Sequence, residues 1–345
     1  MDQVQESSQY QDRVKADVLN MYMNYPYPSY STEERKNIFA AELCRYRFLG
    51  LEPFLAGARI IDVGCGTGHR VLPLAQHFSV KEYVGIDHSS ASLQVAEALV
   101  NELGMTNVTL LEGDLFKLPY DDEYFDIIIS QGVLHHTSDP SRGFRELVRI
   151  CRPGGFVNVF LYNKWNHWRH NLQKNKVNRL AGPDLEKRFE VAHRLFGTKP
   201  IDQMTPAEIA GFYDQYCHPH KSDHTFGETL GWFKKQGLSY WGSHPPLYWG
   251  SYPPLRLRDF IAMAQYRGAL AKDYPFFHTR LSETIAKTSL RLPPLGTRSP
   301  PFDKPTILHR FFWQAMYALQ GARGRYSGGA ALCGRKYPLR ERQNS

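Results

Sequence analysis

The residues with the most chemical content form a glycine-rich turn, Gly64-Cys65-Gly66-Thr67-Gly68, directly after the apolar segment Arg59–Val63. That segment predicts a buried strand, and apolar residues at i, i+3, i+4 and i+7 within 71–78 predict a helix after the turn. Glycines at this junction can adopt positive φ and let a ligand approach the backbone, while the first N–H groups of the helix point toward it. The pattern is typical of a turn that binds a nucleotide-like ligand.

The spacing of the glycines narrows the choice of ligand. In the dinucleotide fingerprint G-x-G-x-x-G, the third glycine would fall on His69 when counted from Gly64 and on Val71 when counted from Gly66. A Walker phosphate loop also fails, because no Gly-Lys-Ser/Thr follows the turn. The turn therefore disfavours both a dinucleotide and a nucleoside triphosphate held by a phosphate loop.

Two carboxylates follow predicted strands further along the chain. Asp87 ends the segment 82–87, 19 residues after Gly68 (87 minus 68), and Asp114 ends the segment 108–114. A carboxylate at the end of the second strand can accept hydrogen bonds from a ribose diol. Because parallel strands end at the same edge of a sheet, we expect both acids to face one site.

The alternation of strand and helix patterns predicts the architecture that positions these residues. A fourth strand is expected over 125–130 and a fifth over 156–161, and short loops between strands and helices indicate a parallel sheet. A last helix and strand are expected over 225–237 and 238–243, after the long insertion 164–224. Insertions at this point of such a sheet lie beside the carboxyl ends of the strands, where ligands bind.

The ordered motifs from about 58 to 162 resemble those of a class I S-adenosylmethionine-dependent methyltransferase, of the ubiquinone/menaquinone-biosynthesis-like subgroup (methyltransferase type 11/25). The resemblance implies an α/β, Rossmann-like, seven-stranded and mostly parallel sheet with helices on both faces, an insertion after strand five and a helical C-terminal extension. The motifs are Asp62-Val-Gly-Cys-Gly-Thr-Gly68, Gly85-Ile-Asp87, Gly113-Asp-Leu115, Leu118-Pro-Tyr-Asp-Asp-Glu-Tyr-Phe-Asp126, Val133-Leu-His-His136 and Arg152-Pro-Gly-Gly155.

The resemblance also implies S-adenosyl-L-methionine as cofactor and a role for each matching residue. The glycines of the turn would accommodate the methionine part, with Asp62 supporting the turn, Asp87 would hold the ribose, and Asp114 with Leu115 would meet the adenine. The backbone around Gln131 would close the site beneath the sulfonium. The cofactor-binding set is Asp62, Gly64, Cys65, Gly66, Gly68, Asp87, His88, Asp114, Leu115 and Gln131.

Four parts of the chain are expected. Residues 1–50 form an N-terminal arm and helices that cover the cofactor site, and 51–163 with 225–250 form the methyltransferase core. Residues 164–224 are a substrate-lid insertion, and 251–345 are the C-terminal helical extension. Within the arm, prolines are expected to stiffen 21–30 into an extended lid that carries Tyr25, Tyr27 and Tyr30.

Candidate catalytic residues come from the insertion and from the end of strand four. His136, His218 and Asp214 are suited to orient or deprotonate an acceptor, because histidine titrates near neutrality and a carboxylate can hold it in one tautomer. The histidines and acids of 212–225 match no zinc pattern with paired ligands, so no metal is predicted.

Charge is distributed unevenly over the 345 residues. The net charge is +8, but 51–163 carries eight Lys/Arg and fourteen Asp/Glu, a net of −6, so the remainder carries +14. This asymmetry can steer an anionic partner: nucleic acid, an acidic metabolite or a membrane surface. An apolar stripe over 308–319 indicates core packing or an interface, and a membrane-surface helix is the less favoured reading.

The leading hypothesis is methyl transfer by in-line SN2 displacement to a small or medium organic acceptor, anionic or lipophilic in character. The alternatives are an RNA (tRNA) nucleoside methyltransferase and a non-catalytic cofactor-binding partner subunit. No signal peptide and no run of eighteen apolar residues is present, and the five cysteines form no CxxC pair. A cytoplasmic location is expected, and the oligomeric state is not readable from the residues.

Overall fold

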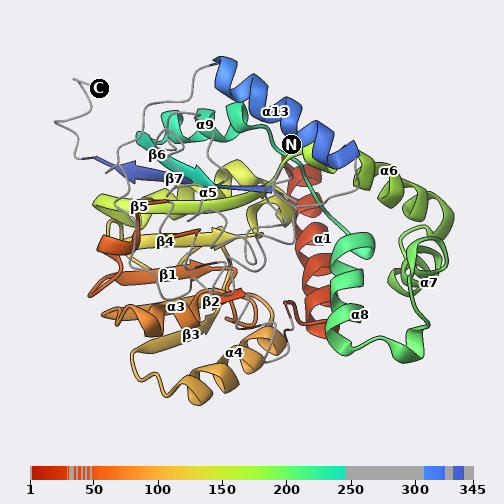
Figure 1. The fold of residues 1–345 in the computed structure, drawn as a ribbon, viewed down its shortest axis with the longest axis horizontal. Coiled ribbons are helices and arrows are strands. Elements are labelled where there is room, and N and C mark those ends of the chain that lie inside the picture. The colour runs from red at the N-terminus through yellow and green to blue at the C-terminus, as the bar shows by residue number, and fades with distance from the viewer. Residues whose placement is uncertain are drawn as a thin grey trace, which may run out of the picture.

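A seven-stranded sheet with helices on both faces forms the centre of the molecule, as Figure 1 shows. The structure is a computed structural model that describes residues 2–28, 30, 35, 38–39, 42, 45–46, 49–244, 307–322 and 329–337. The Rossmann-like fold class expected from the sequence is confirmed. The end of the predicted core, 245–250, and most of the predicted C-terminal extension lie outside the described residues.

The strands lie in the order β3-β2-β1-β4-β5-β7-β6, and the first five are parallel to one another. Each parallel pair is separated in the chain by a helical crossover, so β1, β2, β4 and β5 all end at one edge. The strands are β1 (Arg59–Val63), β2 (Glu82–Asp87), β3 (Val108–Glu112), β4 (Phe125–Gln131), β5 (Cys151–Tyr162), β6 (Leu238–His244) and β7 (Gly329–Lys336).

The predicted helical C-terminal extension also contributes a strand, β7, that was not expected there. It inserts antiparallel between β5 and β6 and is almost wholly buried. Its glycines allow this close packing, because a Cβ on Gly334 would lie 2.8 Å from the Phe233 ring and one on Gly329 would lie 2.0 Å from the Leu161 carbonyl oxygen. The sequence pattern of this segment did not predict a strand, because glycine is depleted in ordinary strands.

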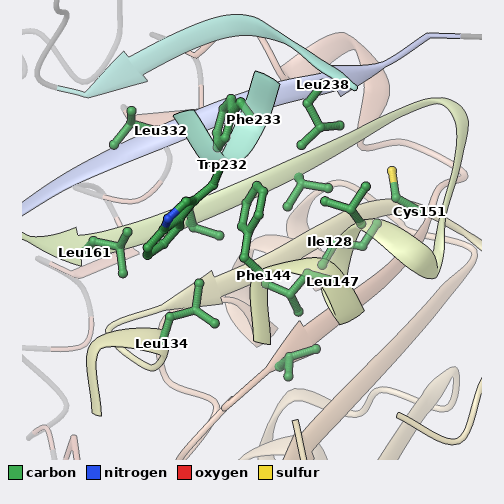
Figure 2. Close-up of a cluster of buried hydrophobic side chains, with 14 of the residues drawn as sticks. Ile128, Leu134, Phe144, Leu147, Cys151, Leu161, Trp232, Phe233, Leu238 and Leu332 are labelled. Carbon is green, nitrogen blue, oxygen red and sulfur yellow. The ribbon is translucent and has the colours of Figure 1, made fainter. Parts of the chain in front are cut away.

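Helices cover the sheet on both faces. On one face α3 (Leu72–His77) and α4 (Ser90–Leu103) pack around buried Tyr83. On the other, α5 (Pro140–Arg149) and α9 (Phe226–Lys235) bring Phe144 and Phe233 into a stack with ring centroids 5.3 Å apart, as Figure 2 shows. These two apolar layers hold the strand ends that form the site.

The N-terminal helix α1 (Asp2–Asn24) lies across the carboxyl-end edge of the sheet and packs against α4. Its apolar residues Val14, Val18 and Met21 are buried. The helix runs through the first part of the segment expected to be extended, because Met21 belongs to its buried face. Only 25–30 leaves the helix, and it carries the three tyrosines of the predicted lid.

The insertion after β5 is a helical unit with a core of its own. It contains α6 (Lys164–Ala181), α7 (Leu185–Phe196), α8 (Pro206–Phe212), a short helical turn η3 (Ile201–Gln203) and a π-helical turn, η4 (Tyr213–Cys217). Buried Val177, Phe189 and Tyr216 come from three of these elements and pack in one cluster.

Both ends of the insertion are fixed at one place. The His224 N–H donates to the Tyr162 carbonyl oxygen at 2.9 Å, and the Lys164 N–H donates to the His224 carbonyl oxygen at 3.1 Å. Helix α13 (Ile307–Ala322) then packs along the outside of α6, as Figure 1 shows. Two short helical turns, η1 (Glu52–Phe54) and η2 (Leu134–His136), complete the described elements.

Candidate active site

A cavity of about 800 Å³ lies at the carboxyl ends of β1, β2, β4 and β5. Its walls come from the strand ends on one side and from α1, the 25–30 segment, α6 and η4 on the other. Such a volume lies toward the upper end of the range for ligand pockets, roughly 300–1,000 Å³. The cavity therefore joins the predicted cofactor motifs to the predicted lid and insertion.

The glycine turn forms the floor of one end of the cavity. Gly64, Gly66 and Gly68 all have positive φ, at 76°, 54° and 72°. A Cβ on Gly64 would lie 2.2 Å from the Val133 side chain, and one on Gly66 would lie 2.7 Å from the Tyr27 carbonyl oxygen. Larger residues are excluded both by φ and by these neighbours, so the turn keeps its backbone open to the cavity.

Asp87 is fixed in orientation by the backbone. Its Oδ2 accepts the Gly66 N–H at 2.8 Å, and its Oδ1 accepts the Ser89 N–H at 2.9 Å. Each carboxylate oxygen keeps a further lone pair that can accept from a ligand hydroxyl. The acid thus couples the glycine turn to the end of β2.

Asp114 connects the end of β3 to the helix above it. Its Oδ2 lies 2.6 Å from Lys15 Nζ of α1, and its Oδ1 accepts the Phe116 N–H at 2.8 Å. Partial burial acts to raise the pKa of Asp114, but these hydrogen bonds outweigh it and hold the pKa below its ordinary value. The charged acid therefore ties α1 over this end of the cavity.

Asp62 and Gln131 lie deeper, under the turn. Burial raises the pKa of Asp62 to about 7, against the opposing effect of the hydrogen bond that the Tyr83 hydroxyl donates to its Oδ2 at 3.1 Å. The Gln131 side chain accepts from Arg45 at 2.9 Å. These polar groups support the floor of the cavity and the end of β4.

The structure brings nearly all predicted cofactor residues together. Gly68 alone does not line the cavity, because it packs against Leu72 at the start of α3 and Ala96 of α4. The nine that line it are Asp62, Gly64, Cys65, Gly66, Asp87, His88, Asp114, Leu115 and Gln131.

The other end of the cavity gathers titratable side chains from α1 and the insertion. Asp214 comes from the π-helical turn η4, a type of turn that often marks functional sites. Its Oδ1 accepts a hydrogen bond from the Tyr22 hydroxyl at 2.9 Å. Burial raises the pKa of Asp214, although this hydrogen bond works in the opposite direction. Asp214 is therefore a carboxylate with enhanced basicity at the cavity wall.

His136 faces the same end and is held in one tautomer. Its Nδ1 lies 3.0 Å from the His220 carbonyl oxygen, which can only accept, so Nδ1 carries the proton and Nε2 keeps its lone pair. Burial lowers the pKa of His136 to about 3. The ring is thus neutral at physiological pH and can accept a hydrogen bond from a ligand.

His218 supports His136 from behind and does not line the cavity. It has no exposed surface, and its ring stacks on His136 with centroids 3.7 Å apart. Its Nδ1 accepts the His220 N–H at 3.2 Å, and burial lowers its pKa well below the ordinary value. The third predicted catalytic residue therefore contacts the site only through its neighbour.

Atoms of His136, Asp214 and His218 that could bind a metal lie within 4.8 Å of one another, the one such group among the described residues. Imidazole nitrogens bind a metal with lone pairs that lie in the ring plane. The two rings are stacked with an interplanar angle of 22°, so their lone pairs lie in two nearly parallel planes, which is unfavourable for shared binding of one ion. The arrangement suits a hydrogen-bonding cluster.

Several cavity residues carried no signal in the sequence. Tyr22 belongs to α1, 192 positions before its partner Asp214. His167 and His170 line the cavity from α6, and Lys221 reaches it from the loop after η4. Lys221 Nζ lies 2.8 Å from His167 Nδ1 and 3.4 Å from Asp223 Oδ1. Only the packing of the insertion against α1 brings these residues together.

The sequence profile of a family described as a methyltransferase domain matches residues 61–159. The chain carries a class I S-adenosylmethionine-dependent methyltransferase domain. The match covers β1 through β5, which supply the cofactor end of the cavity. S-adenosylmethionine is thus the cofactor of this domain.

The methyltransferase domain is similar to curated proteins and to solved structures. An uncharacterized protein of Synechococcus sp. is 26% identical over 208 residues, covering 56% of this chain and 50% of that protein. The demethylmenaquinone methyltransferase of Bacillus pumilus is 34% identical over 102 residues, 29% of this chain and 44% of that enzyme. The matched segments thus span half or less of these relatives.

A solved structure supports the fold of the methyltransferase domain and its surroundings. The structure of PKMT2 from Rickettsia typhi in complex with AdoHcy has a TM-score of 0.52 and 15% sequence identity, and the alignment covers 91% of this chain and 55% of that one. Among the described residues, no helix is both long enough and apolar enough to cross a membrane.

The cavity of the methyltransferase domain fits its cofactor. The turn offers an open backbone, Asp87 offers oriented oxygens, and a Cβ on Gly132, which has φ of 78°, would meet nothing within 4 Å. Space of this kind beside a glycine at the end of β4 can hold a ligand group close to the backbone.

Proposed function

We propose that this chain transfers the methyl group of S-adenosylmethionine to a small or medium organic acceptor. The supporting observation is that one cavity is lined both by the methyltransferase motifs and by side chains of α1 and the insertion. The cofactor end and the acceptor end are therefore contiguous, as an in-line displacement requires.

We assign binding roles to named residues by their place in the cavity, as part of the proposal. The turn from Gly64 to Gly66 would hold the methionine part, Asp87 the ribose, and Asp114 with Leu115 the adenine. Lys15 of α1, bound to Asp114, would close the cofactor end against water. When bound, the cofactor supplies an electrophilic methyl group on a sulfonium.

The acceptor end would position the attacking atom and receive its proton. Asp214 has the raised pKa and cavity exposure expected of a general base for an acceptor hydroxyl or acidic carbon. The Nε2 lone pair of His136 would accept a hydrogen bond that orients the acceptor. His218 would act as a positioning residue, because it contacts His136 rather than the cavity.

The charges around the cavity favour a neutral or lipophilic acceptor. Basic side chains that line it lie beside carboxylates: Lys15 beside Asp114, Arg45 and Arg70 beside Glu42, Lys199 beside Glu208 and Lys221 beside Asp223. A phosphodiester backbone needs cations that can neutralise phosphates, so this pairing counts against RNA as the acceptor. The similarity to a demethylmenaquinone methyltransferase makes quinol-type acceptors the first to test.

Incubation with methyl-labelled cofactor and separate acceptor pools tests the proposal. We expect label in a lipid-soluble or small-molecule fraction from wild type and at least about 100-fold slower labelling from Asp214→Asn, with equal cofactor binding in both proteins. Label in tRNA would favour the RNA alternative. Cofactor binding without label in any pool would favour a non-catalytic partner subunit, and no cofactor binding at all would reject every form of the hypothesis.

A further inference from the structure

Helix α6 has its polarity reversed relative to an ordinary surface helix. Its buried face carries His167, His170 and Lys174, which follow each other at helical spacing. Its outward face carries Trp165, exposed by 44%, and Leu172, exposed by 61%. The two inward histidines line the cavity, and core packing does not explain the apolar residues on the opposite face.

The apolar face continues along α6 and onto α13. Trp168 and Leu180 are 43% and 54% exposed, and the Trp168 indole N–H donates to the Ala318 carbonyl oxygen of α13 at 3.2 Å. On α13, Leu308 and Phe311 are 79% and 70% exposed. Figure 1 shows both helices on the outer side of the molecule. Exposed apolar patches of this extent are uncommon on monomeric soluble proteins and usually mark a contact surface.

Positive charge is interleaved with these apolar residues. Lys164, Arg169, Lys176 and Arg179 are exposed on α6, and neither α6 nor α13 contains an aspartate or glutamate. Helices that lie in the interface of an anionic membrane combine tryptophan and leucine on one side with lysine and arginine beside them. The α6/α13 surface, defined by these outward residues of the two helices, has this composition.

We propose that the α6/α13 surface binds the headgroup region of an anionic lipid bilayer. Trp165, Trp168 and Leu172 would insert among the headgroups, and Lys176 with Arg179 would pair with lipid phosphates. A helix is about 10–12 Å across, so the lipid would lie one helix diameter from His167 and His170 in the cavity wall.

Two other occupants fit the surface less well. RNA is bound by basic and aromatic residues, but exposed aliphatic side chains such as Leu172, Leu180 and Leu308 neither stack on bases nor pair with phosphates. A symmetric dimer would set the same patch against itself, so its lysines and arginines would face two helices without an aspartate or glutamate. Charged residues are also depleted from the centres of such interfaces.

Vesicle flotation of the full chain tests the proposal. The vesicles are phosphatidylcholine alone and phosphatidylcholine mixed with phosphatidylglycerol. We expect wild type to float with the mixed vesicles. The double variant Lys176→Gln/Arg179→Gln is expected to bind them about 25-fold more weakly, about fivefold for each charge. Trp165→Ala/Leu172→Ala is expected to lose binding to the mixed vesicles.

A matched control carries the same loss of charge at the far edge of the sheet, in Lys81→Gln/Lys117→Gln, where both lysines are exposed. It should float like wild type. Unchanged cofactor binding in all variants confirms that they are folded, because none of the substituted residues lines the cavity.

Other outcomes would overturn the assignment. One is a wild type that does not float. Another is a Trp165→Ala/Leu172→Ala variant that floats normally. Two further outcomes would do the same. In one, wild type retains RNA but does not float, and Lys176→Gln/Arg179→Gln no longer retains RNA. In the other, wild type is a dimer, and only Trp165→Ala/Leu172→Ala dissociates it.

Discussion

At the scale of single residues, the site depends on how a few carboxylates are held. Asp87 is fixed by two backbone N–H groups, whereas Asp214 is held by one tyrosine hydroxyl in a buried setting. The first arrangement favours a charged, oriented acceptor of hydrogen bonds, and the second favours a base. Two carboxylates of the same chemical type would thus have different roles because their surroundings differ.

Replacing Asp87 by alanine should weaken cofactor binding by at least tenfold, because the oriented oxygens and the anchor of the Gly66 N–H are both lost. Isothermal calorimetry with S-adenosylmethionine measures this directly. Asp121→Ala, an exposed acid outside the cavity, is the matched control and should bind like wild type. Equal affinities in the two variants would contradict the role given to Asp87.

The turnover of Asp214→Asn should fall by roughly 10²–10⁴-fold, the usual contribution of a general base. In wild type the rate should rise with pH through a pKa above the ordinary aspartate value, because burial raises the pKa of Asp214 and the base acts only when deprotonated. The asparagine variant should lose this rise while cofactor affinity stays the same. An unchanged pH profile in the variant would rule out Asp214 as the base.

Lys174 should make stability depend on pH. Burial, together with the nearby Lys221, lowers the pKa of Lys174 to about 7 in the folded chain, against about 10.4 for an unperturbed lysine. Between these values the unfolded chain binds the proton more tightly, so the stability that Lys174 contributes rises with pH from about 7 and is lost as pH falls back. Denaturant melts of Lys174→Met should show a weaker rise than wild type. Parallel pH profiles for the two proteins would count against this pKa shift.

At the scale of elements, most of the core could be predicted because its signals are local. The strands β1 to β5 and the acids at their ends follow one another in short stretches, so Asp87 and Asp114 were placed correctly beside the glycine turn. One element, β7, could not be read this way. The strand β7 pairs with β5 from about 170 residues away, and its glycines hide the strand pattern.

The same reasoning explains what the sequence missed within the site. Tyr22 of α1 and Asp214 of η4 are 192 positions apart in the chain, so no local motif in the sequence indicates their contact. Gly68, expected to contact the cofactor, packs against Leu72 of α3 and does not line the cavity. Local motifs therefore located the cofactor end well, whereas the acceptor end depends on contacts between distant elements.

The packing of α5 and α9 on the sheet predicts a large loss on truncation. Phe144→Ala should lower the free energy of unfolding by about 3–5 kcal/mol, because Phe144 has no exposed surface and stacks on Phe233. Val95→Ala, at a position exposed by 36%, should change stability by less than about 0.5 kcal/mol. Urea melts compare the two, and similar losses would show that this layer does not stabilise the fold.

At the scale of the whole molecule, the cavity is enclosed by parts that are far apart in the chain. The strand ends, α1 and the insertion all contribute walls, so a ligand that binds there contacts all three. Binding should therefore stabilise the folded protein as a unit.

Thermal unfolding should reveal this coupling. At a free S-adenosylmethionine concentration 100 times the Kd, the folded state gains about 2.7 kcal/mol, so the melting temperature should rise. Asp87→Ala at the same concentration should show a smaller rise, and adenosine triphosphate, which the glycine spacing disfavours, should produce none. A rise of equal size with S-adenosylmethionine and with adenosine triphosphate would show that the cavity does not select the cofactor.

The two ends of the insertion meet where Asn163 bridges His224, beside the last residue of β5. The insertion of some sixty residues therefore leaves and rejoins the core at one point, as a short connection would. Its hydrophobic core does not depend on the strands. A related chain could exchange this cassette for another of different length without moving a strand. Acceptor choice could then diverge between relatives while the cofactor end stayed the same.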